Sequence, residues 1–330
     1  MSPFILSQIR TGFPKGAVAP FGEGARGASS PPKPTVTLLD GGMGQELIRR
    51  GGDQPSPLWA TRVMIDHPGL VQAIHADYFA AGASLATTNT YAIHHDRFVK
   101  FGLDHRFAEF FDAALTQAEA ARDACGRGLI AGSTGPLVAS YRPETLPPHA
   151  EAVALYAEVA AILAPRCDLV VGETVASLAH ARALVEGVRK GAPGAVLWLS
   201  LTVDDRDGTR LRSGEPLAAV AAIAPQVEAI LANCSAPEAM DQAVPVLAGF
   251  GKPFGAYANG FQQITSDFLK DNATVDALSN RPEMTPERYA EFAMGWVAQG
   301  ATLVGGCCET GPDHIAAIAR RLRAAGHPIA

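Results

Sequence analysis

The sequence contains no stretch of 18 or more apolar residues and no run of Lys or Arg. The first absence argues against a membrane-spanning helix, and the second, with a net charge of −6, leaves no basic face for nucleic acid. Only five cysteines occur in 330 residues. A small, odd number of cysteines argues against a disulfide framework and predicts a reducing, cytoplasmic compartment.

The chain does have enough apolar residues for a large core, since 48% are hydrophobic and 18% are charged. The first 34 residues stand apart, because residues 22–34 are rich in Gly, Ser and Pro. We expect residues 1–34 to form a disordered tail. Its start lacks a secretory apolar core, and its basic composition leaves a transit peptide as the alternative. Residues 35–330 are expected to form one domain.

From Thr35 onward, short apolar runs alternate with helical patterns. The runs are apolar on both faces and are bounded by Gly, Asp, Asn or Pro, which is typical of buried parallel strands. The expected strands are Val36–Leu39, Ser84–Thr88, Leu129–Gly132, Leu169–Val171, Val196–Leu201, Ala229–Ala232, Phe254–Ala256 and Ala301–Val304. Helices are expected from Asp66, after Thr285, and near 104–124, 149–165, 176–190, 215–225, 236–249 and 312–325.

Eight βα units in series predict an α/β fold, a single-domain (β/α)8 TIM barrel. The alternative is a doubly wound open sheet, which would want a phosphate-binding glycine turn after the first strand. Asp40-Gly41-Gly42-Met43-Gly44 has the glycines but not the spacing of a dinucleotide fingerprint.

Three thiols lie at expected strand ends, where barrel enzymes carry their catalytic residues. Cys234 follows the sixth strand, and Cys307-Cys308 follow the eighth. Three sulfur ligands would leave one position of a tetrahedral zinc ion open, as catalytic zinc requires. Neighbouring strand residues point opposite ways, so the backbone must turn at the pair, and Gly305-Gly306 permit a turn. The alternative reading is three buried structural thiols.

Five segments follow the order found in the homocysteine S-methyltransferases, and the chain resembles this family from about Val36 to Arg323. The segments are Asp40-Gly41-Gly42, Gly132-Ser133-Thr134-Gly135-Pro136, Glu173-Thr174, Asn233-Cys234-Ser235 and Gly305-Gly306-Cys307-Cys308. The resemblance implies a zinc-dependent barrel that methylates homocysteine to methionine. It implies Zn2+ ligation by Cys234, Cys307 and Cys308.

The same resemblance implies how the substrates bind. Asp40 and Glu173, with the backbone near Gly41 and Thr88, are expected to recognise the amino-acid end of homocysteine. An acidic side chain suits its ammonium group, although both carboxylates could instead cap helices. Trp59 offers an aromatic face to a cationic methyl donor, with plain packing as the alternative.

The family divides by methyl donor. Betaine users carry tyrosines at the positions held here by Ala92 and Thr174, so the resemblance argues against betaine. No Asp-x-His-x-x-Gly segment for cobalamin occurs. We therefore expect a small onium donor, S-methylmethionine first, with betaine or dimethylsulfoniopropionate as alternatives. An insertion at 261–284 is a candidate to reshape the donor pocket.

Two other classes of protein compete with this interpretation. A barrel aldolase or lyase using a Schiff base needs a lysine at a strand end, and none of the six lysines lies at one. A non-enzymatic zinc or thiol-binding protein would not explain carboxylates at the same barrel mouth. The expected partners are therefore homocysteine and a small methyl donor, without nucleic acid or membrane; a homo-oligomer is left open.

Overall fold

The structure is a computed structural model that describes residues 32–52, 59–261 and 281–330; the side chain of Trp59 is outside this description. The expected tail therefore lies outside the described residues, apart from 32–34. Most of the insertion expected at 261–284 lies outside them as well.

Eight parallel strands form a nearly closed barrel, in the order β1-β8-β7-β6-β5-β4-β3-β2. The strands are β1 Thr37–Leu38, β2 Leu85–Thr87, β3 Leu129–Thr134, β4 Leu169–Val175, β5 Leu197–Leu201, β6 Ala229–Asn233, β7 Phe254–Ala258 and β8 Leu303–Gly306. Where β1 meets β2, the backbone N–H of Ser84 donates to the carbonyl of Leu38 at 2.7 Å. The predicted (β/α)8 barrel is confirmed.

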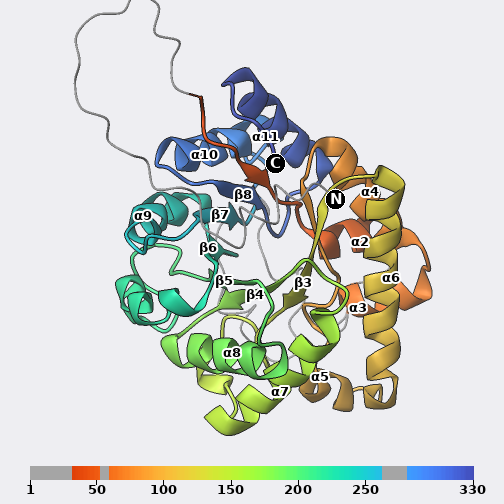
Figure 1. Ribbon diagram of the computed structural model, residues 1–330. Helices are drawn as coiled ribbons and strands as arrows, with labels where there is room; N and C mark the ends of the chain where they lie inside the picture. Colours follow the sequence, from red (N-terminus) through yellow and green to blue (C-terminus); the bar gives the residue numbers. More distant parts are fainter. Residues whose placement is uncertain (1–31, 53–58, 262–280) are drawn as a thin grey trace, which may run out of the picture.

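Helices surround the strands on the outside of the barrel (Figure 1). The α-helices are α2 Met43–Gly51, α3 Trp59–Asp66, α4 Leu70–Ala81, α5 His95–Val99, α6 Phe107–Cys125, α7 His149–Leu163, α8 Leu178–Gly191, α9 Pro237–Ala248, α10 Pro286–Ala298 and α11 Pro312–Ala324. Short 3-10 helices are η1 Asp104–Arg106, η2 Pro143–Thr145, η3 Leu217–Ala222 and η4 Ala224–Gln226. As predicted, α10 begins just after Thr285, whose side chain caps the helix by accepting a hydrogen bond from the Arg288 N–H.

The α-helix predicted at 215–225 is wrong, because this segment forms the two 3-10 helices η3 and η4. Pro216 precedes the first of them and Pro225 lies in the second. A proline disfavours the α conformation in the residue before it and removes one backbone donor, so the segment cannot build a long α-helix.

Several strands extend further at their carboxyl ends than the apolar pattern indicated. β4 was expected to stop at Val171 but continues to Val175 and so includes Glu173 and Thr174. β3 and β7 each continue for two further residues beyond their expected ends. The hydrogen bonds between strands join backbone groups and do not require apolar side chains. A strand can therefore continue past its last core residue into residues that line the site.

The barrel interior is an apolar cluster contributed by all eight strands or their immediate flanks. Its members are Leu39, Leu85, Leu129, Ala131, Leu169, Val171, Val196, Trp198, Ala229, Leu231, Tyr257 and Leu303. These side chains fill the barrel, so any site has to lie at one of its ends.

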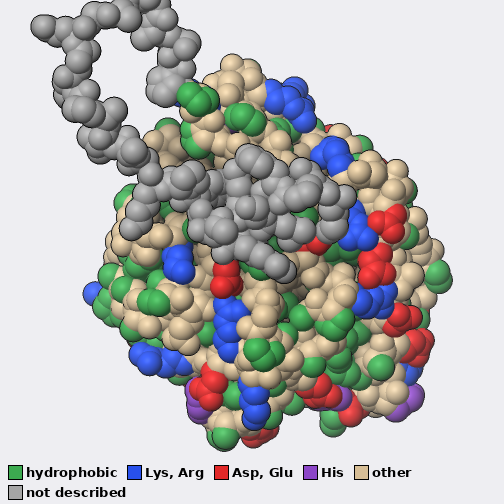
Figure 2. Space-filling view, viewed as in Figure 1, with side chains coloured by type: hydrophobic (Ala, Val, Ile, Leu, Met, Phe, Trp, Pro, Cys, Tyr) green, Lys and Arg blue, Asp and Glu red, His purple; other side chains and the backbone are tan. Residues whose placement is uncertain are grey.

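The outer surface carries charges of both signs. On the face seen in Figure 2, acidic and basic side chains are interspersed and do not gather into one basic patch. Each helix in the described part of the chain is too short or too polar to cross a bilayer.

Candidate active site

The three predicted thiols meet at the carboxyl end of the barrel. The sulfur atoms of Cys234, Cys307 and Cys308 all lie within 4.8 Å of one another. Zn–S bonds of about 2.3 Å place the sulfurs of a tetrahedral site roughly 3.8 Å apart, so the donor set fits a soft metal ion. Hydrogen bonds from Cys234 and Cys307 lower the pKa of the Cys308 thiol well below its usual value.

The backbone turns at Cys307 and Cys308, as is needed for two neighbouring side chains to point toward one ion. The N–H and the hydroxyl of Thr310 both donate to the carbonyl of Cys307, at 3.3 and 2.6 Å, and Glu309 within this turn has φ 61°. The preceding glycines serve close packing, not a left-handed conformation. A Cβ on Gly305 would lie 2.5 Å from the Cβ of Leu39, and one on Gly306 would lie 2.0 Å from Oγ1 of Thr310.

In the segment Asn233-Cys234-Ser235, the outer two side chains form hydrogen bonds that fix the backbone, and the middle one is a thiol of the cluster. The Asn233 side chain accepts from the backbone N–H of Thr174 at 3.0 Å and donates to its hydroxyl at 3.1 Å, which joins the ends of β6 and β4. The Ser235 hydroxyl accepts from the N–H of Val203 at 2.9 Å. Between these anchors Cys234 is buried with φ 51°, an uncommon value for a residue other than glycine.

Asp40 lies just beyond β1 and is almost completely buried. Its two carboxylate oxygens accept hydrogen bonds from the backbone N–H and the hydroxyl of Thr87, both at 2.7 Å. Burial, and in smaller part the charge of Glu173, raise the pKa of Asp40 to about 7. The electrostatic effect of Glu173 indicates that the two carboxylates share one region of the barrel mouth.

Glu173 lies inside β4 and is also buried. Its carboxylate accepts hydrogen bonds from the Ser133 hydroxyl at 2.5 Å and the Tyr257 hydroxyl at 2.8 Å. Burial raises its pKa to about 7. Within the described residues, neither Glu173 nor Asp40 has a cationic partner. Two buried carboxylates that lack a cation could accommodate the positive charge of a ligand.

The other predicted substrate contacts have different surroundings. A Cβ on Gly41 would lie 2.2 Å from the carbonyl oxygen of Thr310, so this glycine is required for the close approach of two loops. The Thr88 hydroxyl bonds the Thr90 hydroxyl at 2.7 Å and accepts from the N–H of Ser133 at 3.0 Å. Substrate contact by Gly41 or Thr88 stays a prediction. The side chain of Trp59, which begins α3, lies outside the described residues.

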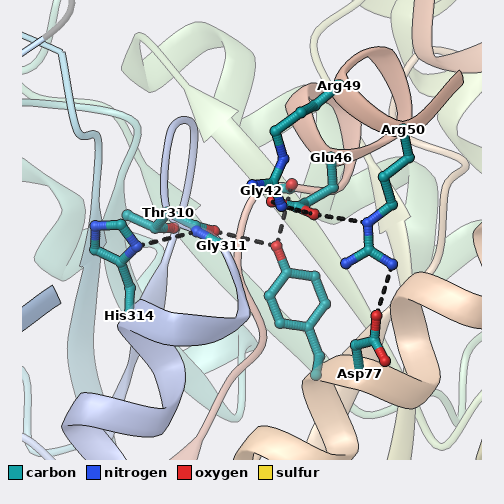
Figure 3. A network of polar contacts seen from close by, with 9 residues as sticks. Gly42, Glu46, Arg49, Arg50, Asp77, Thr310, Gly311 and His314 are labelled. Atoms are coloured by element: carbon teal, nitrogen blue, oxygen red, sulfur yellow. Dashed lines mark hydrogen bonds and ion pairs between the residues drawn. The ribbon is translucent and has the colours of Figure 1, made fainter. Parts of the chain in front are cut away.

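A polar network fixes the loops after β1 and β8 against each other (Figure 3). The Tyr78 hydroxyl of α4 lies 3.1 Å from the carbonyls of both Gly42 and Thr310. In α2, Glu46 accepts from Arg50 at 2.9 Å, and Arg50 pairs with Asp77 of α4 at 2.6 Å. These contacts hold the turn of the vicinal cysteines beside the loop that carries Asp40.

The sequence analysis assigned no role to some residues that lie at the site. Tyr257 lies inside the apolar run of β7, and no local signal distinguishes its hydroxyl, which binds Glu173, from a core tyrosine. Asn259, just after that strand, has its Oδ1 atom buried without a partner among the described residues, as has the Thr134 hydroxyl. Their places at strand ends were the only available signal.

Comparisons with known proteins agree with this geometry. The family model described as Homocysteine S-methyltransferase matches residues 37–322. The chain is 33% identical to the homocysteine S-methyltransferase of Escherichia coli, over 88% of this chain and 96% of that one. It is 28% identical to the homocysteine S-methyltransferase YbgG of Bacillus subtilis, over 86% and 93% of the two chains.

Among solved structures, the metallated form of the homocysteine methyltransferase MmuM from Escherichia coli is similar with a TM-score of 0.73. That match has 31% identity and covers 88% of this chain and 97% of the other. The chain belongs to the homocysteine S-methyltransferase family. It is therefore a methyltransferase, which removes the barrel lyase and the non-enzymatic thiol protein as alternatives.

Proposed function

We propose that this protein transfers a methyl group from a small onium donor, S-methylmethionine first, to the thiol of homocysteine, in a zinc-dependent reaction. The observation that carries the proposal is the cluster of three sulfur atoms within 4.8 Å, at the same barrel mouth as two buried carboxylates. The sulfurs suit a soft metal ion and the carboxylates suit an amino acid. Together they match a thiol-bearing amino acid as methyl acceptor.

Cys234, Cys307 and Cys308 would hold the zinc ion and leave one position for a further ligand. When bound, zinc would hold the acceptor sulfur and favour its thiolate form at neutral pH. The similar Escherichia coli enzyme has a metallated form, which supports a metal-dependent reaction. Three thiolate donors make a more electron-rich site than histidines would, which suits a sulfur nucleophile better than water activation.

Asp40 and Glu173 would bind the ammonium group of homocysteine. The two carboxylates already receive neutral hydrogen bonds from Thr87, Ser133 and Tyr257, which orient them without neutralising their charge. An incoming ammonium would supply the missing positive charge. Because Ser133 and Tyr257 come from β3 and β7, the position of Glu173 is fixed from both sides.

The reaction itself is a displacement at the methyl carbon. The acceptor thiol loses its proton to solvent, its sulfur forms the new bond to the methyl carbon, and the donor keeps the electron pair of the bond that breaks. A neutral thioether leaves when the donor is a sulfonium. No side chain has to act as an acid, because the leaving group needs no proton.

A sulfonium donor is favoured over betaine. Thr174 occupies one tyrosine position of the betaine users, and its hydroxyl accepts a hydrogen bond from Asn233, so no aromatic ring is available there. Ala92 occupies the other such position. Two faces that would surround a trimethylammonium group are thus missing from this chain.

The test is to measure metal content and methyl transfer on the same purified protein. We expect about one zinc per chain and methionine formation from homocysteine with S-methylmethionine. Betaine and dimethylsulfoniopropionate are assayed in parallel at equal concentration. Removing the metal with a chelator should abolish turnover, and adding zinc should restore it. Full turnover of the metal-free protein would refute zinc dependence, and silence with all three donors would refute the proposed reaction.

A further inference from the structure

Arg212, on the segment that follows β5, is a cationic side chain close to the thiol cluster. Its backbone N–H donates to the carbonyl of Thr202 at 3.3 Å, and its Nε atom lies 3.5 Å from the hydroxyl of the same threonine. That hydroxyl in turn donates to the carbonyl of Cys234 at 3.3 Å. Arg212 is thus connected to the backbone of a thiol residue through a single side chain.

The guanidinium of Arg212 is mostly buried and incompletely satisfied. Its side chain is 12% exposed and forms an ion pair with Asp205, with 2.7 Å between Nη2 and Oδ1. The same Oδ1 atom accepts from the N–H of Ala236 at 2.8 Å. Nη2 nevertheless lacks an acceptor in hydrogen-bond geometry among the described residues. A buried guanidinium with such a donor favours a second anion.

Tyr141 places this cation relative to the sulfurs. The Arg212 guanidinium carbon lies 5.5 Å from the centre of the Tyr141 ring. Burial and then the charges of Cys234 and Cys308 raise the pKa of the Tyr141 hydroxyl, which lies within their electrostatic reach. The Tyr141 ring therefore lies beside the cation, and its hydroxyl is within electrostatic range of the sulfurs. A short molecule with a methyl group at the sulfurs would have its other end near the guanidinium.

We propose that Arg212 binds the carboxylate of the methyl donor, so that the enzyme selects onium donors that carry a carboxylate. The inference rests on the proposed function. The carboxylate of a donor could accept hydrogen bonds from the guanidinium, which Asp205 alone leaves incompletely bonded, whereas a donor without a carboxylate offers no acceptor there. S-methylmethionine and dimethylsulfoniopropionate belong to the selected class; trimethylsulfonium and the methyl esters do not.

The decisive experiment compares each donor with its methyl ester. For the unmodified enzyme, we expect kcat/KM with S-methylmethionine or dimethylsulfoniopropionate to exceed that of the ester by about 30-fold or more, the loss expected for about one charge-assisted hydrogen bond. Equal use of acid and ester by an active enzyme would overturn the inference and leave the proposed function intact. Absence of transfer from every donor would instead defeat the proposed function.

Variants then assign the preference to Arg212. Arg212→Gln should lower kcat/KM for the acid by about 30-fold and for the ester by less than about threefold, and Arg212→Lys should recover part of the loss. The matched control is Arg210→Gln, because Arg210 lies two residues away, is exposed and pairs with Asp207. It should leave both donors unaffected.

Two further measurements separate this role from a structural one. Equilibrium dialysis of S-methylmethionine without homocysteine should show weaker binding to Arg212→Gln at unchanged zinc content. An equal loss for acid and ester, or a rise confined to the KM of homocysteine, would contradict donor recognition by Arg212. The acid-to-ester comparison on the unmodified enzyme remains decisive even if the variant fails to fold.

Discussion

The interior of the barrel and its carboxyl-terminal mouth are built by opposite rules. The interior is apolar, and side chains such as Leu231 are fully buried in regular strands. The mouth buries carboxylates and thiols and holds irregular backbone. All five non-glycine residues with positive φ in the described chain follow or end barrel strands: Val138, Tyr141, Thr174, Cys234 and Glu309.

This contrast shows where stability and chemistry reside. A left-handed conformation costs roughly 1–2 kcal/mol for a residue with a Cβ, and buried carboxyl groups are costly to ionise. Such features persist only where the surrounding structure fixes them. The apolar interior supplies that stability, which lets the mouth keep Asp40 and Glu173 buried.

The largest expected effect tests the chemistry of the mouth. Cys234→Ala should lose the bound metal and lower methyl transfer by about 1,000-fold or more, because the two sulfur ligands that remain are too few to hold the ion. Metal analysis and turnover on the same sample check this result. Cys125→Ala is the control, since Cys125 is exposed at the end of α6, outside the barrel. Retained metal with full activity in Cys234→Ala would break the comparison.

A mutation in the barrel interior should lower stability and leave metal binding unchanged. Leu231→Ala removes a fully buried side chain and should lower the free energy of unfolding by about 2–5 kcal/mol, measured by denaturant titration. The zinc content of the folded protein should stay unchanged. The exposed Val99 provides the control, because Val99→Ala should alter stability by less than about 0.5 kcal/mol. A loss below 1 kcal/mol at Leu231 would show that the interior is not the stabilising part.

Removing one carboxylate should affect the acceptor and not the metal. Glu173→Gln deletes a charge-assisted contact worth about 1.5–3 kcal/mol, so the KM for homocysteine should rise roughly 10- to 150-fold at pH 8. Zinc content and the KM of the donor should remain near their original values. An unchanged affinity for homocysteine would remove Glu173 from the site.

The pH dependence of homocysteine binding follows from the raised pKa values. Burial holds the pKa of Asp40 and of Glu173 at about 7, so both carboxyl groups become protonated as the pH falls below 7. An ammonium binds the ionised forms, so the KM for homocysteine should rise as the pH drops from 8 to 6. In Glu173→Gln the profile should be shallower, because one titrating group is gone. A flat profile in the unmodified enzyme would contradict this assignment.

The smallest effect concerns backbone strain. Val138 is a β-branched residue at φ 62°, where Asn is tolerated better. Val138→Asn should therefore change the free energy of unfolding by no more than about 1 kcal/mol, in either direction. Val171→Asn, in the barrel interior, should destabilise by about 2 kcal/mol or more, because it buries an amide without partners. Thermal unfolding of the two variants would sharpen the contrast.

The periodic parts of the chain were predictable because they obey local rules. Runs such as Val196–Leu201 predicted strands, and Thr285-Pro286 predicted the start of α10. The α-helix predicted at 215–225 was wrong, because the alanine-rich pattern was given more weight than two prolines that favour 3-10 geometry. The carboxyl end of β4 was also not predicted, because the polar Glu173 interrupts the apolar pattern that marks a buried strand.

By itself, the sequence determined the order of the elements and the residue types at their ends, because hydrophobic periodicity and turn chemistry act over a few residues. It placed Asp40, Glu173 and the three cysteines at strand ends. Only the tertiary structure brought Cys234 beside Cys307 and Cys308, buried two carboxylates without a cation, and set Arg212 against Tyr141. These relations depend on barrel closure and loop packing between residues far apart in the chain, which no local pattern encodes.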